Sequence, residues 1–261
     1  MSVRYEASDG LAVITLDRPE LLNAFNDELG NAALERVLEA SADPEVRCIV
    51  VTGAGRAFSS GEDLAALADG YARGEAPPLG DTLRNRYNPL IRALRAAPKP
   101  VVAAVNGVAA GAGVSIVLAC DFRIASEKAK LVLAFVKVGL VPDAGSMWFL
   151  TRTIGAAKAF ELAASGDPLD ARRAHELGLF TEVVPEDGFE ARWKAFAAEL
   201  AGGPTRAYAL IKRLSEHAAE SSLDAQLEFE IGAQSEAGAT ADHLEGVNAF
   251  FEKRPPKFVG E

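Results

Sequence analysis

The stretch NGVAAGAGVSIVLACD, residues 106–121, joins glycines and small residues to an apolar run that ends in a cysteine and an aspartate. Such a pattern is consistent with a membrane span, a phosphate-cradling loop, or a turn at which bare backbone meets a ligand. A span is disfavoured because Asn106, Ser115 and three glycines interrupt the run over 101–119. We therefore expect a strand, a turn and a buried helix.

The same alternation of strand, turn and helix extends outward from this stretch. Runs rich in β-branched residues predict strands over 11–17, 46–53 and 99–107, and short strands within 121–135. Helical spacing predicts helices over 26–42 and 146–165, and mostly helical structure over 190–251. Residues 69–85 mix glycine, proline and charge without periodicity and predict a mobile loop. The predicted fold class is α/β with a helical C-terminal region.

Composition and charge exclude several classes of function. The 261 residues carry a formal net charge of −10, which argues against a nucleic-acid partner because phosphate binding needs a basic face. Cys48 and Cys120 lie in apolar surroundings, typical of neither disulfides nor metal sites. The N-terminal segment carries charges throughout and resembles no secretory signal, so we expect a cytoplasmic protein without a membrane anchor.

Two common catalytic motifs are incomplete in this chain. TGAG, residues 52–55, lacks the further glycine of a dinucleotide-binding loop, because Ala57 stands in its place. The Gly-x-Ser-x-Gly elbow of serine hydrolases is interrupted, since Val117 replaces its second glycine. No His/Cys cluster has metal-ligand spacing, so we expect no metal ion. The three histidines lie in charged, helical contexts typical of surfaces: His175, His217 and His243.

Two strand-to-helix turns remain as candidates, RAFSSGEDL (56–64) and NGVAAGAGVS (106–115). Small residues there let a ligand reach the backbone, and N–H groups at a helix start are unpaired donors. Two such turns meeting at one point would form an oxyanion hole that stabilises an enolate of a thioester. The pattern alone leaves open whether they meet.

Four segments together resemble the enoyl-CoA hydratase/isomerase (crotonase) superfamily: AVITLDRPELLNAF (12–25), GAGRAFSSGEDL (53–64), KPVVAAVNGVAAGAGVSIVLACDFRIASEKAKL (99–131) and GLVPDAG (139–145). The resemblance implies a spiral of repeated ββα units over 1–195 and a helical trimerisation region over 196–261. It also implies a coenzyme A thioester as substrate, no separate cofactor, and self-association as a trimer or hexamer.

The resemblance further assigns binding positions. The oxyanion-hole N–H groups would be those of Glu62 and Ala112, where Ala112 replaces a common glycine and is tolerable if its φ is negative. The positions that match the coenzyme A groove are Leu22, Ala24, Ser60, Asp63 and Leu64. Two further positions match residues that a neighbouring subunit contributes to the nucleotide end, Phe250 and Lys253, the latter in the basic segment EKRPPKF.

Departures from the family pattern indicate the chemistry. Hydratases of the family use two glutamates, whose positions here hold Ser115 and Phe135, and neither side chain can take a proton from water as a carboxylate does. Asp143 matches the catalytic base of a branch that isomerises ring-epoxide phenylacetyl-CoA and 3-enoyl-CoA esters, and the nucleophile of related dehalogenases. If Phe135, Trp148 and Phe149 enclose Asp143, desolvation raises its pKa, whereas a nearby helix N-terminus lowers it.

We therefore predict an acyl-CoA isomerase of fatty acid or phenylacetate catabolism, with Asp143 as the base and residues 69–85 shaping the acyl pocket. Three alternatives stay open. Glu62 or Asp63 could activate water in a hydratase, Asp143 could be a nucleophile in dehalogenation or thioester hydrolysis, and the chain could bind acyl-CoA without catalysis.

Overall fold

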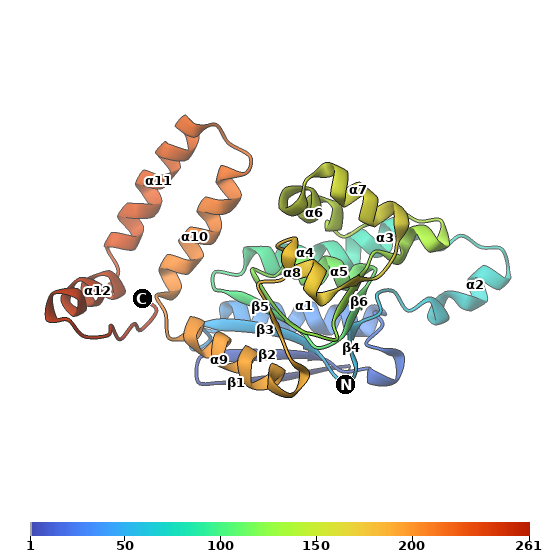
Figure 1. The fold of residues 1–261 in the computed structure, drawn as a ribbon, viewed down its shortest axis with the longest axis horizontal. Coiled ribbons are helices and arrows are strands. Elements are labelled where there is room, and N and C mark those ends of the chain that lie inside the picture. The colour runs from blue at the N-terminus through green and yellow to red at the C-terminus, as the bar shows by residue number, and fades with distance from the viewer. Residues whose placement is uncertain (1) are drawn as a thin grey trace.

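The larger of two β-sheets holds six strands in the order β1-β2-β3-β5-β7-β10, seen edge-on in Figure 1. In the computed structural model, which describes residues 2–261, β1 and β2 are antiparallel and the other neighbours are parallel. The smaller sheet has the order β4-β6-β8-β9. The strand bounds are β1 Val3–Ser8, β2 Leu11–Leu16, β3 Cys48–Gly53, β4 Ala57–Ser59, β5 Val101–Val105, β6 Val108–Ala110, β7 Phe122–Ser126, β8 Lys130–Val132, β9 Leu169–Asp170 and β10 Glu182–Val184.

From β3 to β8, successive strands alternate between the two sheets. β3, β5 and β7 pair in parallel in the larger sheet, and the strand that follows each of them, β4, β6 or β8, pairs in the smaller one. Helices follow each pair, so the chain advances as a spiral of ββα turns. As a result, the turns after β4 and β6 lie at neighbouring positions of the smaller sheet.

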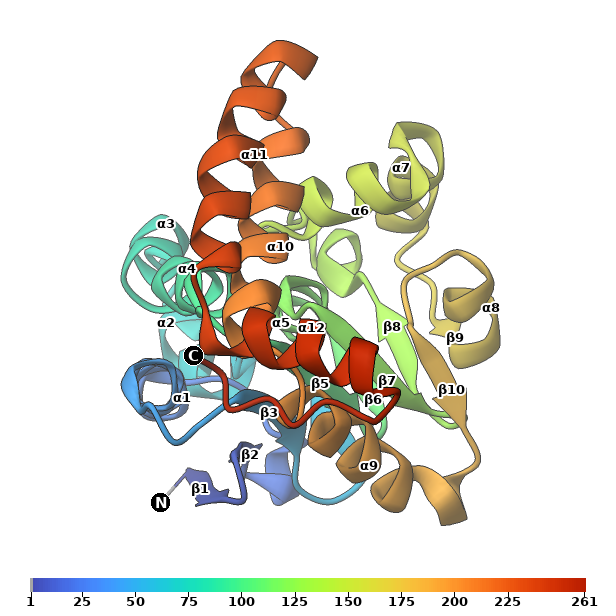
Figure 2. The same ribbon diagram turned by 90° about the vertical axis from the view of Figure 1, so that its left-hand side faces the viewer.

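Helices cover the sheets and extend beyond them at the C-terminal end. Their bounds are α1 Asp27–Ala42, α2 Ala68–Ala72, α3 Leu79–Thr82, α4 Asn88–Ala96, α5 Ala112–Ala119, α6 Ser146–Ile154, α7 Ala156–Ser165, α8 Ala171–Glu176, α9 Phe189–Ala201, α10 Thr205–Ala218, α11 Leu223–Gly238 and α12 Ala241–Glu252. Figure 1 shows α10 to α12 extending from the sheets as an arm, and Figure 2, in which this arm faces the viewer, shows α12 in front of the sheets. The predicted division at 195/196 falls within the continuous helix α9 and stays a prediction, and Met1, where the first segment begins, lies outside the described residues.

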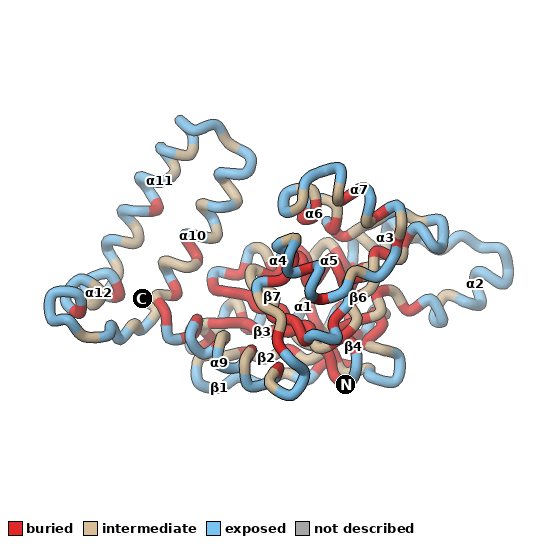
Figure 3. Tube along the Cα trace, in the orientation of Figure 1, coloured by how far each residue is buried: buried red, intermediate tan, exposed pale blue. Residues whose placement is uncertain are grey.

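The ββα spiral is much more buried than the arm formed by α10 to α12. Every residue of α5 is buried, and β5 is buried along its whole length (Figure 3). In α11 only Ala233 is buried. Large apolar side chains on the arm are exposed: Ile211, Leu223, Leu227, Ile231, Leu244, Phe250 and Phe251. The predicted buried helix after residue 111 is thus confirmed, whereas the arm presents apolar surface with no partner within the described chain.

Two sequence predictions about local structure are wrong in detail. The predicted single helix over 146–165 is two helices, because Gly155 leaves the helical conformation at φ 78°, ψ 157°. The predicted loop over 69–85 contains α3 and most of α2, and a π-helical segment begins in it, Leu83–Tyr87. Elements of four or five residues span too few turns to produce a recognisable apolar period.

Candidate active site

The two small-residue turns meet in the structure. Gly61, in the turn after β4, packs against the turn before α5, and a Cβ placed there would lie 2.8 Å from the Ala110 carbonyl oxygen and 3.3 Å from the Ala112 nitrogen. Its φ of +87° is also a conformation that side-chain-bearing residues rarely adopt. Glycine at 61 therefore permits the close approach that sequence reasoning left open.

Two backbone donors are available at this junction. Ala112 is the first residue of α5, where an N–H has no intrahelical acceptor, and its φ is not positive, as the alanine requires. Glu62 forms a parallel bridge with Phe25 that uses the Gly61 carbonyl and the Asp63 N–H. Within residues 2–261, neither the Glu62 nor the Ala112 N–H donates a hydrogen bond.

Glu62 and Ala112 both line one apolar cavity of about 230 Å³. Its walls come from the turn after β4, the segment after α2, the start of α5 and the loop before α6. The lining residues are Ser60, Glu62, Leu64, Leu79, Thr82, Leu83, Tyr87, Gly111, Ala112, Ala134, Phe135, Val138, Leu140, Val141 and Asp143. The structure thus brings Glu62, Ala112 and Asp143 together, and residues from the 69–85 segment do line the cavity.

Asp143 is the carboxyl group with the most unusual surroundings in this cavity. Its Oδ1 atom is buried and has no hydrogen-bond partner among the described residues. Burial, and secondly the charge of Glu62, raise the pKa of Asp143 from 3.8 to about 6. The direction that the sequence left open is therefore upward, and the group is suited to accepting and returning a proton near neutral pH.

Ser115 holds the turn that carries Asp143. Its Oγ donates a hydrogen bond to the Asp143 carbonyl oxygen at 3.0 Å, and Ser146 donates to the same oxygen through its N–H and its Oγ, both at 2.9 Å. Ser115 is fully buried in α5. Where a hydratase would carry a glutamate, this chain carries a residue that fixes the Asp143 backbone.

The Glu62 side chain has partners that sequence reasoning missed. Its two oxygens accept hydrogen bonds from the Arg86 guanidinium, both at 2.6 Å, and the Tyr87 hydroxyl donates to one of them at 2.6 Å. Arg86 and Tyr87 lie in the π-helical segment, 24 and 25 residues away. We find no pattern in the sequence that pairs residues so far apart across a segment without periodicity.

Of the residues matched to the coenzyme A groove, Ser60 and Leu64 line the cavity and the other three do not. The Leu22 carbonyl accepts from the Ser60 N–H at 2.9 Å, Ala24 is buried beside them, and Leu64 is half exposed. Asp63 is buried, accepts from Arg18 at 2.9 Å and does not line the cavity. Its carboxylate is thereby committed to an ion pair and is not placed to activate water in the cavity.

Phe250 and Lys253 lie far from the cavity within one chain. Phe250 lies in the last turn of α12 and Lys253 directly follows that helix, which Figure 1 shows at the opposite side of the molecule from α2 and α3. Phe250 is 78% exposed. A role at the nucleotide end would have to be filled in a second copy of the chain.

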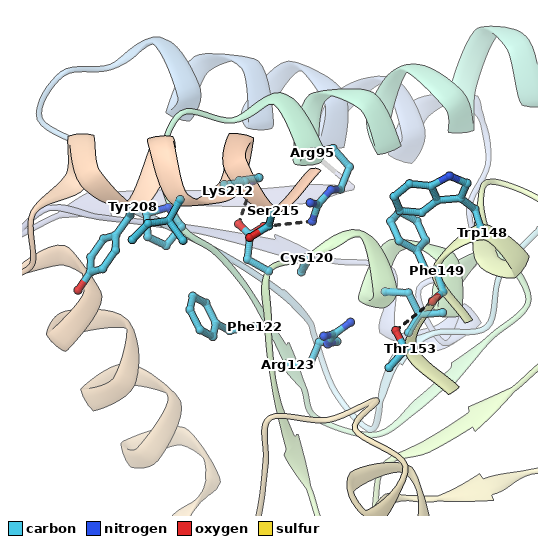
Figure 4. Close-up of a pocket in the computed structure, with 14 residues that line it drawn as sticks. Arg95, Cys120, Phe122, Arg123, Trp148, Phe149, Thr153, Tyr208, Lys212 and Ser215 are labelled. Carbon is cyan, nitrogen blue, oxygen red and sulfur yellow. Dashed lines mark hydrogen bonds and ion pairs between the residues drawn. The ribbon is translucent and has the colours of Figure 1, made fainter. Parts of the chain in front are cut away.

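Two aromatic residues expected around Asp143 lie elsewhere. Trp148 and Phe149 line a second cavity of about 320 Å³ between α6, α10 and β7, where Figure 4 shows them side by side. Only Phe135 of the three expected aromatics lines the cavity of Asp143. The other walls around Asp143 are formed by residues that include Leu83, Tyr87, Val138, Leu140 and Val141.

The second cavity is lined by none of the three residues Glu62, Ala112 and Asp143. Arg95 and Lys212 form ion pairs with the Asp121 carboxylate, at 3.1 and 2.9 Å, and Arg123, labelled in Figure 4, also lines this cavity. In the part of the chain that the structure describes, no three His, Cys, Asp or Glu side chains are placed to hold a metal ion. Nor does any described helix have the length and apolar character needed to cross a membrane.

The amino-acid sequence matches known proteins over nearly its whole length. The family profile described as Enoyl-CoA hydratase/isomerase matches residues 6–261. A Rhodobacter capsulatus protein named "Probable enoyl-CoA hydratase" is 47% identical over 99% of this chain and 98% of its own. The 1,2-epoxyphenylacetyl-CoA isomerase of Escherichia coli is 44% identical over 97% of this chain and 96% of its own.

Solved structures agree with the fold. The crystal structure of an enoyl-CoA hydratase from Bacillus anthracis superposes with a TM-score of 0.93 at 31% identity, covering 100% of both chains. The predicted crotonase-like α/β fold is therefore confirmed. With the profile and relatives above, these matches show that the chain belongs to the enoyl-CoA hydratase/isomerase family.

Proposed function

We propose that the chain is an acyl-CoA isomerase in which Asp143 moves a proton between two carbons of an enolate. The enolate would bind the N–H groups of Glu62 and Ala112. The substrate would be a 3-enoyl-CoA, converted to a 2-enoyl-CoA, or a ring-epoxide of phenylacetyl-CoA. The observation that carries the proposal is that the unpaired Asp143 carboxyl shares one apolar cavity with two unpaired backbone donors.

For a 3-enoyl thioester the cycle balances with this one acid–base group. Asp143 removes a proton from C2, and the electron pair of that C–H bond delocalises onto the thioester oxygen as an enolate. Two N–H donors stabilise the charge where it develops. Asp143 then returns the proton to C4, and the double bond is left between C2 and C3. A single carboxyl suffices because it is base first and acid second.

The positions of the two hydratase glutamates support isomerisation over hydration. Ser115 donates to the Asp143 backbone, and Phe135 forms part of the cavity wall. Neither side chain offers a carboxylate that could activate water. The isomerase name of the Escherichia coli relative agrees with this choice.

The test is incubation of the protein with 2-enoyl, 3-enoyl and arylacetyl CoA esters in deuterated water, followed by mass spectrometry. Isomerisation predicts deuterium exchange without net addition of water. Asp143→Asn should abolish exchange and retain acyl-CoA binding, and an Asn variant with undiminished turnover refutes the assignment of the base. A covalent adduct trapped on Asp143 would instead indicate nucleophilic chemistry.

A hydratase is the second candidate, favoured by the name of the Rhodobacter relative and by the Glu62 carboxylate in the cavity. It predicts loss of the enoyl-thioester ultraviolet absorption when crotonyl-CoA is added. A chain that only binds acyl-CoA predicts tight binding and no exchange with any ester of the panel.

Substrate binding completes the proposal. The coenzyme A moiety would lie along Leu22, Ala24, Ser60, Asp63 and Leu64, and no separate cofactor is needed. Phe250 and Lys253 would reach the nucleotide end of a neighbouring subunit in a trimer or a hexamer. The exposed apolar side chains of α10 to α12 support self-association through that arm. Fatty acid or phenylacetate catabolism as the pathway, and the cytoplasm as the location, stay predictions.

A further inference from the structure

Two carboxylates share the candidate cavity, and they differ in their hydrogen-bond partners. Both oxygens of Glu62 are bound, by the Arg86 guanidinium and the Tyr87 hydroxyl. Asp143 has a buried oxygen with no partner among the described residues. One carboxylate is thus fixed as an ion pair and the other is left free to react.

The clamp on Glu62 is built into the packing of the chain. Arg86 is only 6% exposed, and its stem passes over Gly30, at the end of the first turn of α1. A Cβ at Gly30 would lie 2.4 Å from the Arg86 Cγ atom. Glycine inside a helix is unfavourable, so its presence here is explained by the room that Arg86 needs.

The π-helical segment sets the direction of both donors. It places Arg86 and Tyr87 next to each other at the end of Leu83–Tyr87, with the guanidinium 4.9 Å from the centre of the Tyr87 ring. The Tyr87 ring also packs against Phe25 at 5.7 Å, on the strand-like segment that bridges to Glu62. Single π-helical turns inside helices are frequent at functional sites.

We propose that Glu62 is a positioning residue of the reaction: its carboxylate, clamped by Arg86 and Tyr87, acts through its charge on Asp143 in the cavity that they share. This inference rests on the isomerase function proposed above. Glu62 takes up no proton in the cycle. Asp143 alone accepts the substrate proton, which can exchange with solvent there before it is returned.

The charges around Asp143 support this role. Burial is the first cause of its raised pKa, and the Glu62 charge is the second. From the other elements that line the cavity, Tyr87 contributes a neutral hydroxyl whose own pKa burial raises, and α5 contributes only Ser115. Arg86 is the one described cation held against this cluster, and it also contacts the exposed Asp27 at 3.3 Å.

The pairing with Arg86 reduces an electrostatic conflict. A free carboxylate beside the oxyanion hole would repel the enolate as well as Asp143. The Arg86 counter-charge offsets part of this repulsion, both on the enolate and on Asp143.

The experiment is the pH dependence of kcat/KM for Glu62→Gln, with the 3-enoyl ester that the wild-type protein converts. The amide keeps the shape of the side chain and removes its charge, so Asp27 is then the remaining carboxylate that contacts Arg86. We expect the acid limb of the profile to move to lower pH. We also expect kcat above pH 7 to fall about threefold to tenfold, because a weaker base removes the proton more slowly, with KM little changed.

Two further variants make the test decisive. Glu182→Gln removes a carboxylate that Arg192 holds in the same way, at 2.9 and 3.0 Å, and should leave the profile unchanged. Tyr87→Phe removes a donor to Glu62, which leaves its charge less screened, so the acid limb should move to higher pH. This arm stands even where the Gln variant does not fold.

The outcomes separate this inference from the proposed function. An unmoved acid limb in Glu62→Gln, or a limb moved to lower pH in Tyr87→Phe, overturns the role of Glu62 while Asp143→Asn still abolishes exchange. Full activity of Asp143→Asn overturns the function itself. A large rise in KM at unchanged kcat would show that Glu62 only shapes the binding site.

Discussion

Replacing Asp143 by asparagine should remove activity and at the same time stabilise the folded protein at neutral pH. The carboxyl group is buried without a hydrogen-bond partner for Oδ1, so its ionised form is unfavourable in the folded state. Asparagine has nearly the same shape and carries no charge. A group placed for proton transfer is thus expected to lower the stability of the fold.

The magnitude follows from the pKa of Asp143, which the fold raises from 3.8 to about 6. This change corresponds to about 3 kcal/mol, because one pKa unit is worth about 1.4 kcal/mol. Because the side chain is partly exposed, solvent screens the effect, and we expect roughly 1 to 2 kcal/mol. Below pH 3.8 the carboxyl is protonated in both states and no deficit exists. Above pH 6 it is ionised in both, and the full deficit is present.

The assay is urea unfolding of the wild-type protein and Asp143→Asn at pH 4 and pH 8, at one protein concentration. We expect the variant to be more stable by roughly 1 to 2 kcal/mol at pH 8 and nearly equal at pH 4. Asp187→Asn, at an exposed carboxylate, serves as the control and should change neither value. A variant that is no more stable at pH 8 than at pH 4, relative to wild type, refutes the reasoning.

Three further predictions concern rate, geometry and assembly. Since Asp143 must be ionised to accept a proton, kcat/KM should fall below a pH of about 6, as a pH–rate profile would show, and a flat profile down to pH 5 contradicts this. Gly61→Ala should lower kcat on the order of a hundredfold, because its Cβ would lie 2.8 Å from the Ala110 oxygen and displace the donor turn, with folding followed by circular dichroism. The proposed assembly through α12 predicts that replacing both exposed residues Phe250 and Phe251 by serine lowers the sedimentation coefficient in analytical ultracentrifugation, and an unchanged coefficient would argue against that assembly.

Much of the fold was readable because it depends on local patterns. The β-branched runs over 11–17 and 99–107 became β2 and β5, and the small, apolar run after residue 111 became the buried helix α5. The short strands could not be predicted from the sequence. β4 and β6 have three residues each and gain their hydrogen bonds from each other, so only pairing across the spiral defines them.

The candidate site was readable only in part. Asp143, Glu62 and Ala112 could be selected because each stands in a segment with a recognisable order of residues, and all three line one cavity. The surroundings of Asp143 could not be selected, since Trp148 and Phe149 are its sequence neighbours and yet line another cavity. Which cavity a side chain lines depends on tertiary packing, and nearness in the sequence does not determine it.

The sequence by itself determined the family, the strand and helix types, and the replacement of two hydratase glutamates by Ser115 and Phe135. These features follow from residue identity and short-range spacing. Only the tertiary structure decided that the turns at 61 and 111 meet and that Ser115 fixes the Asp143 backbone. It alone brought Arg86 to Glu62. The physical reason is that a hydrogen bond or a like-charge repulsion acts over a few ångströms in space, and residues 24 or 28 positions apart reach that range only when the spiral closes.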